Sequence, residues 1–131
     1  MEILSIVTQS LSALLLIMVG TLRISNPIKN YAKNSGITLT NNVDLLNELR
    51  GTSAVMLFGG IILLFGIFSQ EITMASFVVG TLIFLGFALG RIISMSVDGK
   101  PNKQIIQGLI FELVLGALNA ICLINALSLE S

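Results

Sequence analysis

The sequence predicts an all-α integral membrane protein in which a single domain forms a four-helix bundle. The first observation is composition, because 54% of the 131 residues are hydrophobic and only 11% are charged, whereas a soluble domain is usually about 25% charged. The second observation is four apolar segments, each near the roughly 20 residues needed to cross a bilayer core. They cover about residues 3–22, 52–68, 72–93 and 105–127, which favours one four-span domain over residues 1–131.

The first apolar segment is predicted to be a retained membrane helix and not a cleaved signal peptide. A signal peptide carries a basic region before a short apolar core, but here Glu2 precedes the segment and the first basic residue is Arg23. Ser5, Gln9 and Ser12 share one side of this helix. We expect them to bond with each other or with a neighbouring helix, because an isolated amide in lipid is costly. A second, outward-facing ligand site at that end stays an alternative, although no charge would anchor it.

The connection that follows is too long for a simple turn. Its stretch "NPIKNYAKNSG" mixes Pro27, Gly36 and several asparagines, and it reads as turn and surface chain. After it, Asn42 can cap a helix over residues 43–51 that carries Asp44 in its first turn. This helix is either an amphipathic interfacial segment or an N-terminal extension of the second span, and the sequence favours neither.

The second and third spans are joined by only "SQE", so they are predicted to be antiparallel neighbours. Both spans contain glycine at positions that suit close packing. Gly59, Gly60 and Gly66 line the second span, while Gly86 and Gly90 form a small-xxx-small pair in the third. Such residues let helices approach closely, so we expect packing in preference to a ligand site lined by backbone.

The basic residues predict the orientation of the bundle in the membrane. All seven Lys and Arg residues lie in or at the edges of the first and third connections. Since short cytoplasmic loops carry an excess of Lys and Arg, these two connections are expected in the cytoplasm and both termini outside.

Polar residues gather at the same predicted face. The fourth span starts there, and Glu112 lies seven residues inside it, which is about 10 Å along a helix. A carboxylate at a helix centre in the membrane costs about 2.5–3.5 kcal/mol, so it normally faces the bundle and finds a partner. We predict that Glu112 pairs with Arg91, with Arg50 as the alternative. The candidate ligand-binding or ion-pair cluster comprises Asn47, Arg50, Arg91, Ser94, Asp98 and Glu112.

Several small residues are assigned to turns and packing around this cluster. The stretch "VDGKP" has ordinary turn chemistry in which Gly99 can supply a positive φ. Beside Arg91 and Glu112 it also forms a candidate lip over a pocket. Gly108 and Gly116 share a small and polar face of the fourth span with Glu112. The turn and packing residues are therefore Gly86, Gly90, Gly99, Pro101, Gly108 and Gly116.

The sequence lacks the residues that several common chemistries need. Without histidine there is no Ser-His-Asp triad and no histidine metal cluster, and the carboxylates show no metal-loop spacing. We therefore expect no cofactor and no metal. The net charge of zero argues against a nucleic-acid partner. Cys122 reads as an apolar packing residue. A conventional hydrolase or redox enzyme is not expected, and an acid–base isomerase using Glu112 stays a minor alternative.

Four short motifs carry a resemblance to a known family. "NELRG" before the second span, "GR" closing the third, "DGKP" in the next connection and a Glu inside the fourth resemble the bacterial family of domain of unknown function 4345. The resemblance covers about residues 47–119. It implies a small four-helix protein of the bacterial inner membrane, with no established activity. By matching position, the family's signature residues would be Asn47, Arg50, Gly90, Arg91, Gly99, Pro101 and Glu112.

Two hypotheses for function follow. In the first, a pocket on the cytoplasmic side binds a lipid-like, quinone-like or small anionic ligand, because the site is charged at its lip and apolar below. That pocket would be built from Arg50, Arg91, Asp98 and Glu112. In the second, the chain is a non-catalytic accessory subunit that packs against a larger membrane complex or another copy of itself, and its charges only set the register of the helices. In both cases the lipid bilayer surrounds the spans.

Overall fold

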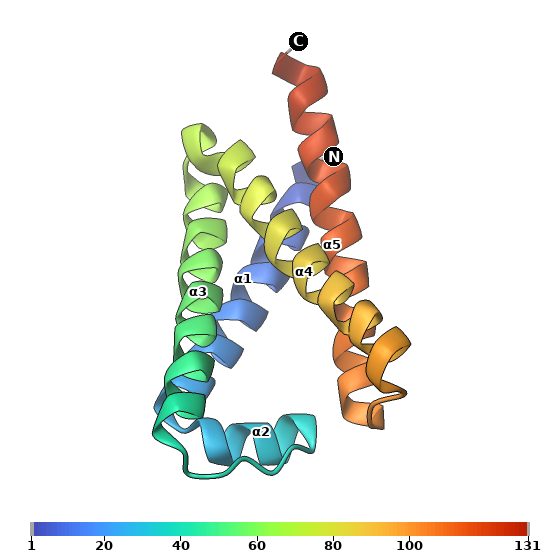
Figure 1. Ribbon diagram of the computed structural model, residues 1–131. Coiled ribbons are helices and arrows are strands. Elements are labelled where there is room, and N and C mark those ends of the chain that lie inside the picture. Colours follow the sequence, from blue (N-terminus) through green and yellow to red (C-terminus); the bar gives the residue numbers. More distant parts are fainter. Residues whose placement is uncertain (1, 131) are drawn as a thin grey trace.

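The computed structural model describes residues 2–130, which fold into five α-helices (Figure 1). They are α1 (Glu2–Ser25), α2 (Pro27–Ser35), α3 (Val43–Phe68), α4 (Gln70–Asp98) and α5 (Lys103–Glu130). The four long helices are α1, α3, α4 and α5, and each is long and apolar enough to cross a membrane. We call the end that carries α2 and the α4–α5 connection the basic end, and the end where α1 begins and α5 finishes the terminal end (Figure 1).

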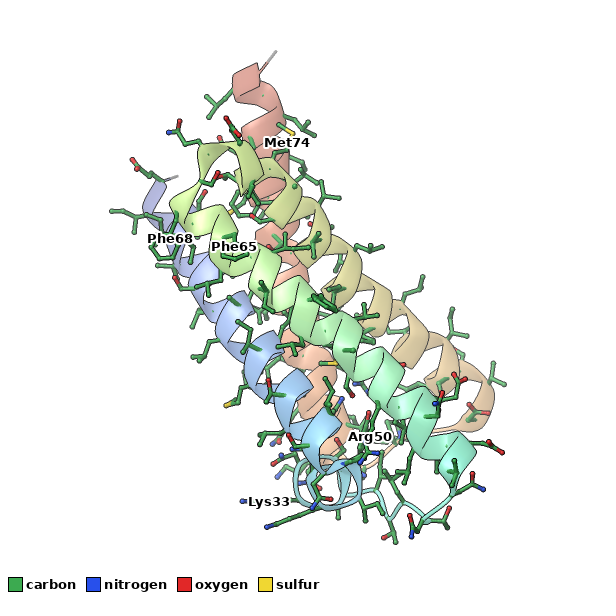
Figure 2. The ribbon with its side chains drawn as sticks, turned by 90° about the vertical axis from the view of Figure 1, so that its left-hand side faces the viewer. Lys33, Arg50, Phe65, Phe68 and Met74 are labelled. Carbon is green, nitrogen blue, oxygen red and sulfur yellow. The ribbon has the colours of Figure 1, made fainter. Side chains whose placement is uncertain are left out.

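Apolar side chains project outward along the four long helices. Phe65 and Phe68 lie on this outer surface near the terminal end, where they are 55% and 81% exposed (Figure 2). Lys33 and Arg50 lie at the basic end in the same view. A soluble protein rarely exposes a large contiguous apolar surface, and the hydrocarbon core of a bilayer accommodates one. The predicted all-α, four-helix membrane fold is confirmed.

Helix α1 packs mainly against α3, α3 against α4, and α4 against α5, and the core lies between these four helices. Its buried side chains are Ala13, Leu16, Met56, Leu63, Ile83, Phe84 and Leu115. Glycine allows α1 and α3 to approach closely, since a Cβ on Gly60 would lie 2.9 Å from the backbone nitrogen of Ile17. Gly59 and Gly66 are buried against side chains of α4. The predicted packing role of the second-span glycines is confirmed.

Only some of the glycines in the third and fourth spans make close contacts with another helix. Gly86 and Gly90 are exposed on α4, and a Cβ on either would meet nothing within 4 Å. Gly108 on α5 is equally open. Gly116 is buried, and a Cβ there would lie 3.3 Å from the backbone nitrogen of Leu85. Within this chain Gly116 makes a close helix contact, whereas Gly86, Gly90 and Gly108 make none, so their packing role stays a prediction.

The asparagine-rich stretch after α1 forms helix α2, so its prediction as turn and surface chain was wrong. The side chain of Asn26 accepts a hydrogen bond from the backbone N–H of Lys29 at 3.3 Å, and Pro27 occupies the first turn. Gly36 ends the helix in the left-handed conformation, with φ 65°. Asn before Pro and a glycine nine residues later are standard helix start and stop signals.

Residues 43–51 run straight into the second span, so the extension alternative is the right one. Asn42 caps α3 as predicted, since its side-chain oxygen accepts from the backbone N–H of Leu45 at 3.1 Å. Ser69 alone separates α3 from α4, and its extended backbone reverses the chain. The two helices are the antiparallel neighbours that the short connection predicted (Figure 1).

Candidate functional site

Arg91 and Glu112 form the ion pair that the sequence predicted. Arg91 Nε donates to Glu112 Oε1 at 2.7 Å, which joins α4 to α5 toward the basic end. The side chain of Glu112 is 11% exposed and that of Arg91 is 31% exposed. A hydrogen bond between two ionised groups is shorter and stronger than a neutral one, so this contact fixes how the two helices meet.

Arg50, the alternative partner for Glu112, is engaged elsewhere. Its Nε donates to the backbone carbonyl of Ile24 at 3.0 Å. Carbonyl groups in the last turn of a helix lack partners within the helix, so Arg50 satisfies one of them at the end of α1. This contact ties the start of α3 to the end of α1.

The other predicted cluster residues lie outside the ion pair. Ser94 Oγ donates to Asp98 Oδ2 at 2.8 Å within α4, and both residues are exposed, as is Asn47 on α3. Gly99 has the predicted positive φ, at 107°, and a Cβ there would meet nothing within 4 Å. Together with Pro101 it belongs to the α4–α5 connection. The ion pair therefore unites two of the six predicted residues.

Arg23 is one of the basic residues that predict the orientation of the bundle in the membrane. In the structure it holds α2 across the basic end. Its Nε donates to Asn30 Oδ1 at 3.3 Å and its Nη2 donates to Ser35 Oγ at 3.1 Å. Its guanidinium carbon lies 4.2 Å from the centre of the Tyr31 ring, within the range of a cation–π interaction. All three partners belong to α2, a helix that the sequence pattern did not predict.

Arg23 also carries a charge that no carboxylate neutralises. Within residues 2–130, no Asp or Glu lies within salt-bridge distance of its guanidinium. Glu112 is close enough to act on it electrostatically, but Arg91, the partner of Glu112, acts in the opposite sense. A guanidinium has five N–H donors, of which two make the hydrogen bonds described above. The basic end therefore combines an excess positive charge with unused donors, which is suited to an anion.

The far end of α2 is fastened to the start of α5. Asn102 Oδ1 caps α5 by accepting from the backbone N–H of Ile105 at 2.9 Å, while its Nδ2 donates to the carbonyl of Ser35 at 2.8 Å. Gln104 Nε2 donates to the carbonyl of Lys33 at 3.0 Å. These contacts satisfy carbonyl groups of the last turn of α2. Helix α2 is thus held to α1 by one side chain and to α5 by two.

A hollow of about 320 Å³ lies at the corner between α1 and α2. Lys29 and Lys33 line it, and so does Asn30, the partner of Arg23. Leu22, which is 46% exposed on α1, supplies an apolar edge. The two lysines are four residues apart and therefore share a face of α2. A hollow that is basic on one side and apolar on the other suits an amphipathic anion.

Comparison with known proteins gives one match. A family model described as "Domain of unknown function (DUF4345)" matches residues 5–123, which is most of the chain. No curated protein and no solved structure matches the chain.

Proposed function

The chain belongs to the DUF4345 family, and we propose that it is a small membrane protein that binds the phosphate headgroup of an anionic lipid at its basic end. The observation that supports the proposal is the hollow at the α1–α2 corner, whose lining residue Asn30 accepts a hydrogen bond from Arg23, a guanidinium with no carboxylate within salt-bridge distance in residues 2–130. Lys29 and Lys33 add two more positive charges to that hollow. Each Lys or Arg near a membrane surface contributes about 1 kcal/mol to the attraction for anionic lipids.

An anionic lipid also accounts for the apolar edge of the hollow. Met18 and Leu22 are 49% and 46% exposed on the outside of α1, so an acyl chain can follow them away from a phosphate held between Lys29 and Lys33. A small free anion makes no use of these contacts. A neutral quinone-like compound, the other ligand class that the sequence suggested, gains less from the basic charges.

The proposal includes an orientation. We infer a bacterial inner membrane, with the basic end in the cytoplasm and both termini outside. All seven Lys and Arg residues of the chain belong to the basic end or to its connections, and the positive-inside rule relates such loops to the cytoplasm. The cytoplasmic leaflet is also a leaflet that offers anionic lipids.

The test is native mass spectrometry of the full chain, purified gently in a neutral detergent and incubated with phosphatidylglycerol, phosphatidylcholine or inorganic phosphate. Wild type is compared with Lys29→Gln/Lys33→Gln and with the matched control Lys100→Gln/Lys103→Gln, which loses the same charge at the same end but does not alter the hollow. Removing two lysines that contact a phosphate is expected to weaken phosphatidylglycerol binding about tenfold or more relative to the control.

Each outcome of this test bears on the proposal. Retention of phosphatidylglycerol by wild type and by the control, with loss in Lys29→Gln/Lys33→Gln, supports it. Equal losses in both double variants would mean that the lipid responds only to overall charge. Binding of inorganic phosphate with equal affinity would replace the lipid with a free anion, and retention of no lipid at all would contradict the proposal.

A second candidate function rests on the exposed glycines of α4. Gly86 and Gly90 form an open small-xxx-small face with nothing within 4 Å, and such faces pair membrane helices. An accessory subunit or a homo-oligomer would use this face. Gly86→Ile/Gly90→Ile would then convert a complex into a monomer, while Leu89→Ile on the same exposed side of α4 would not. A wild type that is monomeric and copurifies with no partner removes this candidate.

A further inference from the structure

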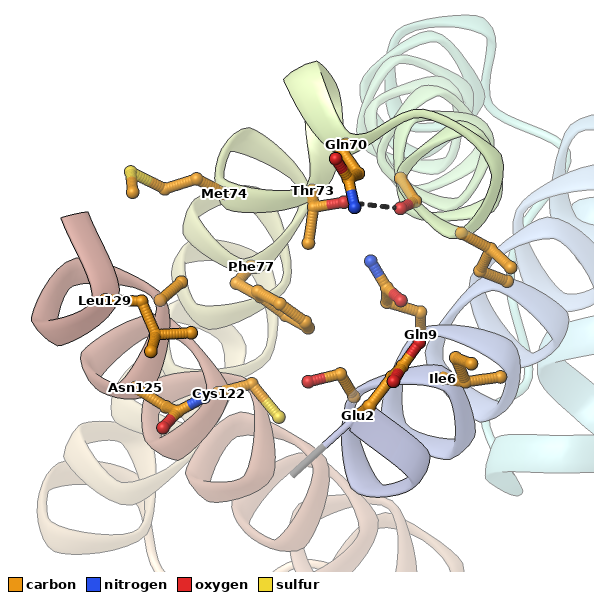
Figure 3. Close-up of a pocket in the computed structure, with 14 residues that line it drawn as sticks. Glu2, Ile6, Gln9, Gln70, Thr73, Met74, Phe77, Cys122, Asn125 and Leu129 are labelled. Carbon is orange, nitrogen blue, oxygen red and sulfur yellow. Dashed lines mark hydrogen bonds between the residues drawn. The ribbon is translucent and has the colours of Figure 1, made fainter.

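The terminal end of the bundle contains a larger hollow, of about 640 Å³, walled by all four long helices (Figure 3). It lies at the opposite end from the proposed lipid site and shares no lining residue with it. Hollows of this size accommodate small organic molecules. The sequence left a site at this end as an alternative that lacked a charge to anchor it.

A buried amide is aimed into this hollow. Gln9 is 2% exposed, and its side chain points between α1 and α4 (Figure 3). Its Nε2 donates to Ser76 Oγ at 3.0 Å, while its carbonyl oxygen has no hydrogen-bond partner within the described part of the chain. Gly66 makes room for this pair, since a Cβ there would lie 2.9 Å from Gln9 Nε2. The hollow therefore offers a preorganised acceptor to a ligand.

Among the described residues, the one charged side chain that lines the hollow is acidic. Glu2 is its one lining carboxylate, and no Lys or Arg lines it. The basic residues of the chain all belong to the other end, whereas Glu71 at the start of α4 adds a second carboxylate to the terminal end. A cleft lined by charge of one sign raises the local concentration of ligands of the opposite sign. The carboxylates at the terminal end therefore favour binding of a cation over binding of an anion.

Apolar side chains form part of the remaining wall, beside the polar residues Ser5, Gln70, Thr73 and Asn125. Phe77 extends toward the centre of the hollow, and Met74 and Leu129 lie around it (Figure 3). Aromatic and thioether groups suit an organic cation with an apolar body, because the ring face attracts the charge and methionine adapts to irregular shapes.

We propose that the terminal-end hollow binds a small organic ammonium ion with an apolar body. The ammonium group lies toward Glu2 and the carbonyl oxygen of Gln9, and the apolar body lies against Phe77 and Met74. This site is independent of the anionic-lipid site at the basic end. A variant can therefore lose ligand binding at one site and keep it at the other.

The test uses benzyltrimethylammonium and its neutral isostere neopentylbenzene, with the full chain in a neutral maltoside detergent. Carbon-13 methyl NMR of the methionines reports where each probe binds. Met74 lines the hollow, while Met56 belongs to the core and Met95 lies in the last turns of α4 near the basic end. We expect a saturable shift of the Met74 methyl with the cation, and no matching shift at Met56 or Met95.

Two variants and one control separate the site from general effects. Glu2→Gln removes the charge with little change of shape and is expected to weaken binding of the cation about threefold to fivefold, as suits one exposed charge pair. Glu71→Gln removes a carboxylate at the same end that does not line the hollow, and binding should stay within about twofold. Ala126→Leu fills the hollow and should abolish the Met74 shift while the other methionine signals remain.

The proposal is overturned if wild type gives no saturable Met74 shift with the cation. It is also overturned if Glu2→Gln and Glu71→Gln weaken binding equally, because the cation would then respond only to the charge of that end. Equal affinity for neopentylbenzene would reduce the site to an apolar cavity, and it would refute the role given to Glu2.

Discussion

Arg91 and Glu112 lie 21 residues apart in the chain and meet at 2.7 Å across the α4–α5 interface. In the described part of the chain this is the one ion pair. Because both partners project from helices that run antiparallel on either side of a short connection, sliding one helix past the other by a single turn would separate the charges by about 5 Å. The pair therefore specifies the register of α4 against α5.

Removing the acid of this pair should destabilise the protein. Glu112→Gln leaves the Arg91 guanidinium without its counterion, but Arg91 is 31% exposed, so water compensates in part. We expect a loss of about 1–2 kcal/mol in the free energy of unfolding, less than for a fully buried pair. Thermal unfolding in neutral detergent, followed by circular dichroism, measures it.

The control for this prediction is a double-mutant cycle. Arg91→Gln/Glu112→Gln removes both charges and should be more stable than the sum of the two single losses predicts. Ser94→Ala, at the exposed contact with Asp98, should change stability little. A Glu112→Gln variant as stable as wild type would show that the pair does not fix the register.

Arg23→Gln should release α2 from the bundle. The substitution removes the guanidinium that donates to Asn30 and Ser35 and that lies over the Tyr31 ring. We expect faster amide hydrogen exchange over residues 27–35, with the four long helices unchanged. Lys29→Gln is the control, because it removes an exposed charge from α2 without touching these contacts. Unchanged exchange in Arg23→Gln would mean that the contacts from α5 suffice to hold α2.

Two glycine substitutions should have different effects on the free energy of unfolding. Gly60→Ala places a Cβ 2.9 Å from the backbone of α1, and overpacking of this kind usually costs about 1–3 kcal/mol. Gly86→Ala meets nothing within 4 Å and should be neutral or stabilising by up to about 1 kcal/mol, because alanine is the better helix former. Thermal unfolding of both variants checks the difference, and equal destabilisation would contradict it.

Cysteine labelling should report the orientation. Cys122 is 1% exposed and should react slowly, so Cys122→Ala gives a clean background. In intact cells an impermeant maleimide is expected to label Glu71→Cys at the terminal end but to label Lys100→Cys at the basic end only after permeabilisation. The reverse pattern would place the basic end outside and contradict the proposed topology.

The sequence was sufficient for the parts of the fold that depend on local pattern. Four long apolar runs, the "SQE" connection and the cap at Asn42 determined the spans and the pairing of α3 with α4. The Arg91–Glu112 pair was also predictable, because a carboxylate inside a span requires a partner and the candidates entering from the same end were few.

The rest depended on tertiary contacts that no local pattern encodes. The partners of Arg23 lie on α2, whose short polar sequence resembles a loop. Which glycines pack depends on the direction in which each helix face turns, so Gly60 and Gly86 look alike in sequence and differ in the structure. The terminal-end hollow needs all four long helices, and Glu2 becomes significant only when they converge.

The attachment of α2 to α5 has a consequence for biosynthesis. Asn102 and Gln104 contact carbonyl groups 67 and 71 residues earlier in the chain. At synthesis rates of about 5–20 residues per second, roughly 4–14 s pass between the translation of α2 and that of its partners on α5. During that interval α2 depends on Arg23 alone among these contacts. The basic end can therefore close only once the start of α5 has been made, and the terminal end, which needs residues 122–129 of the same helix, closes after it.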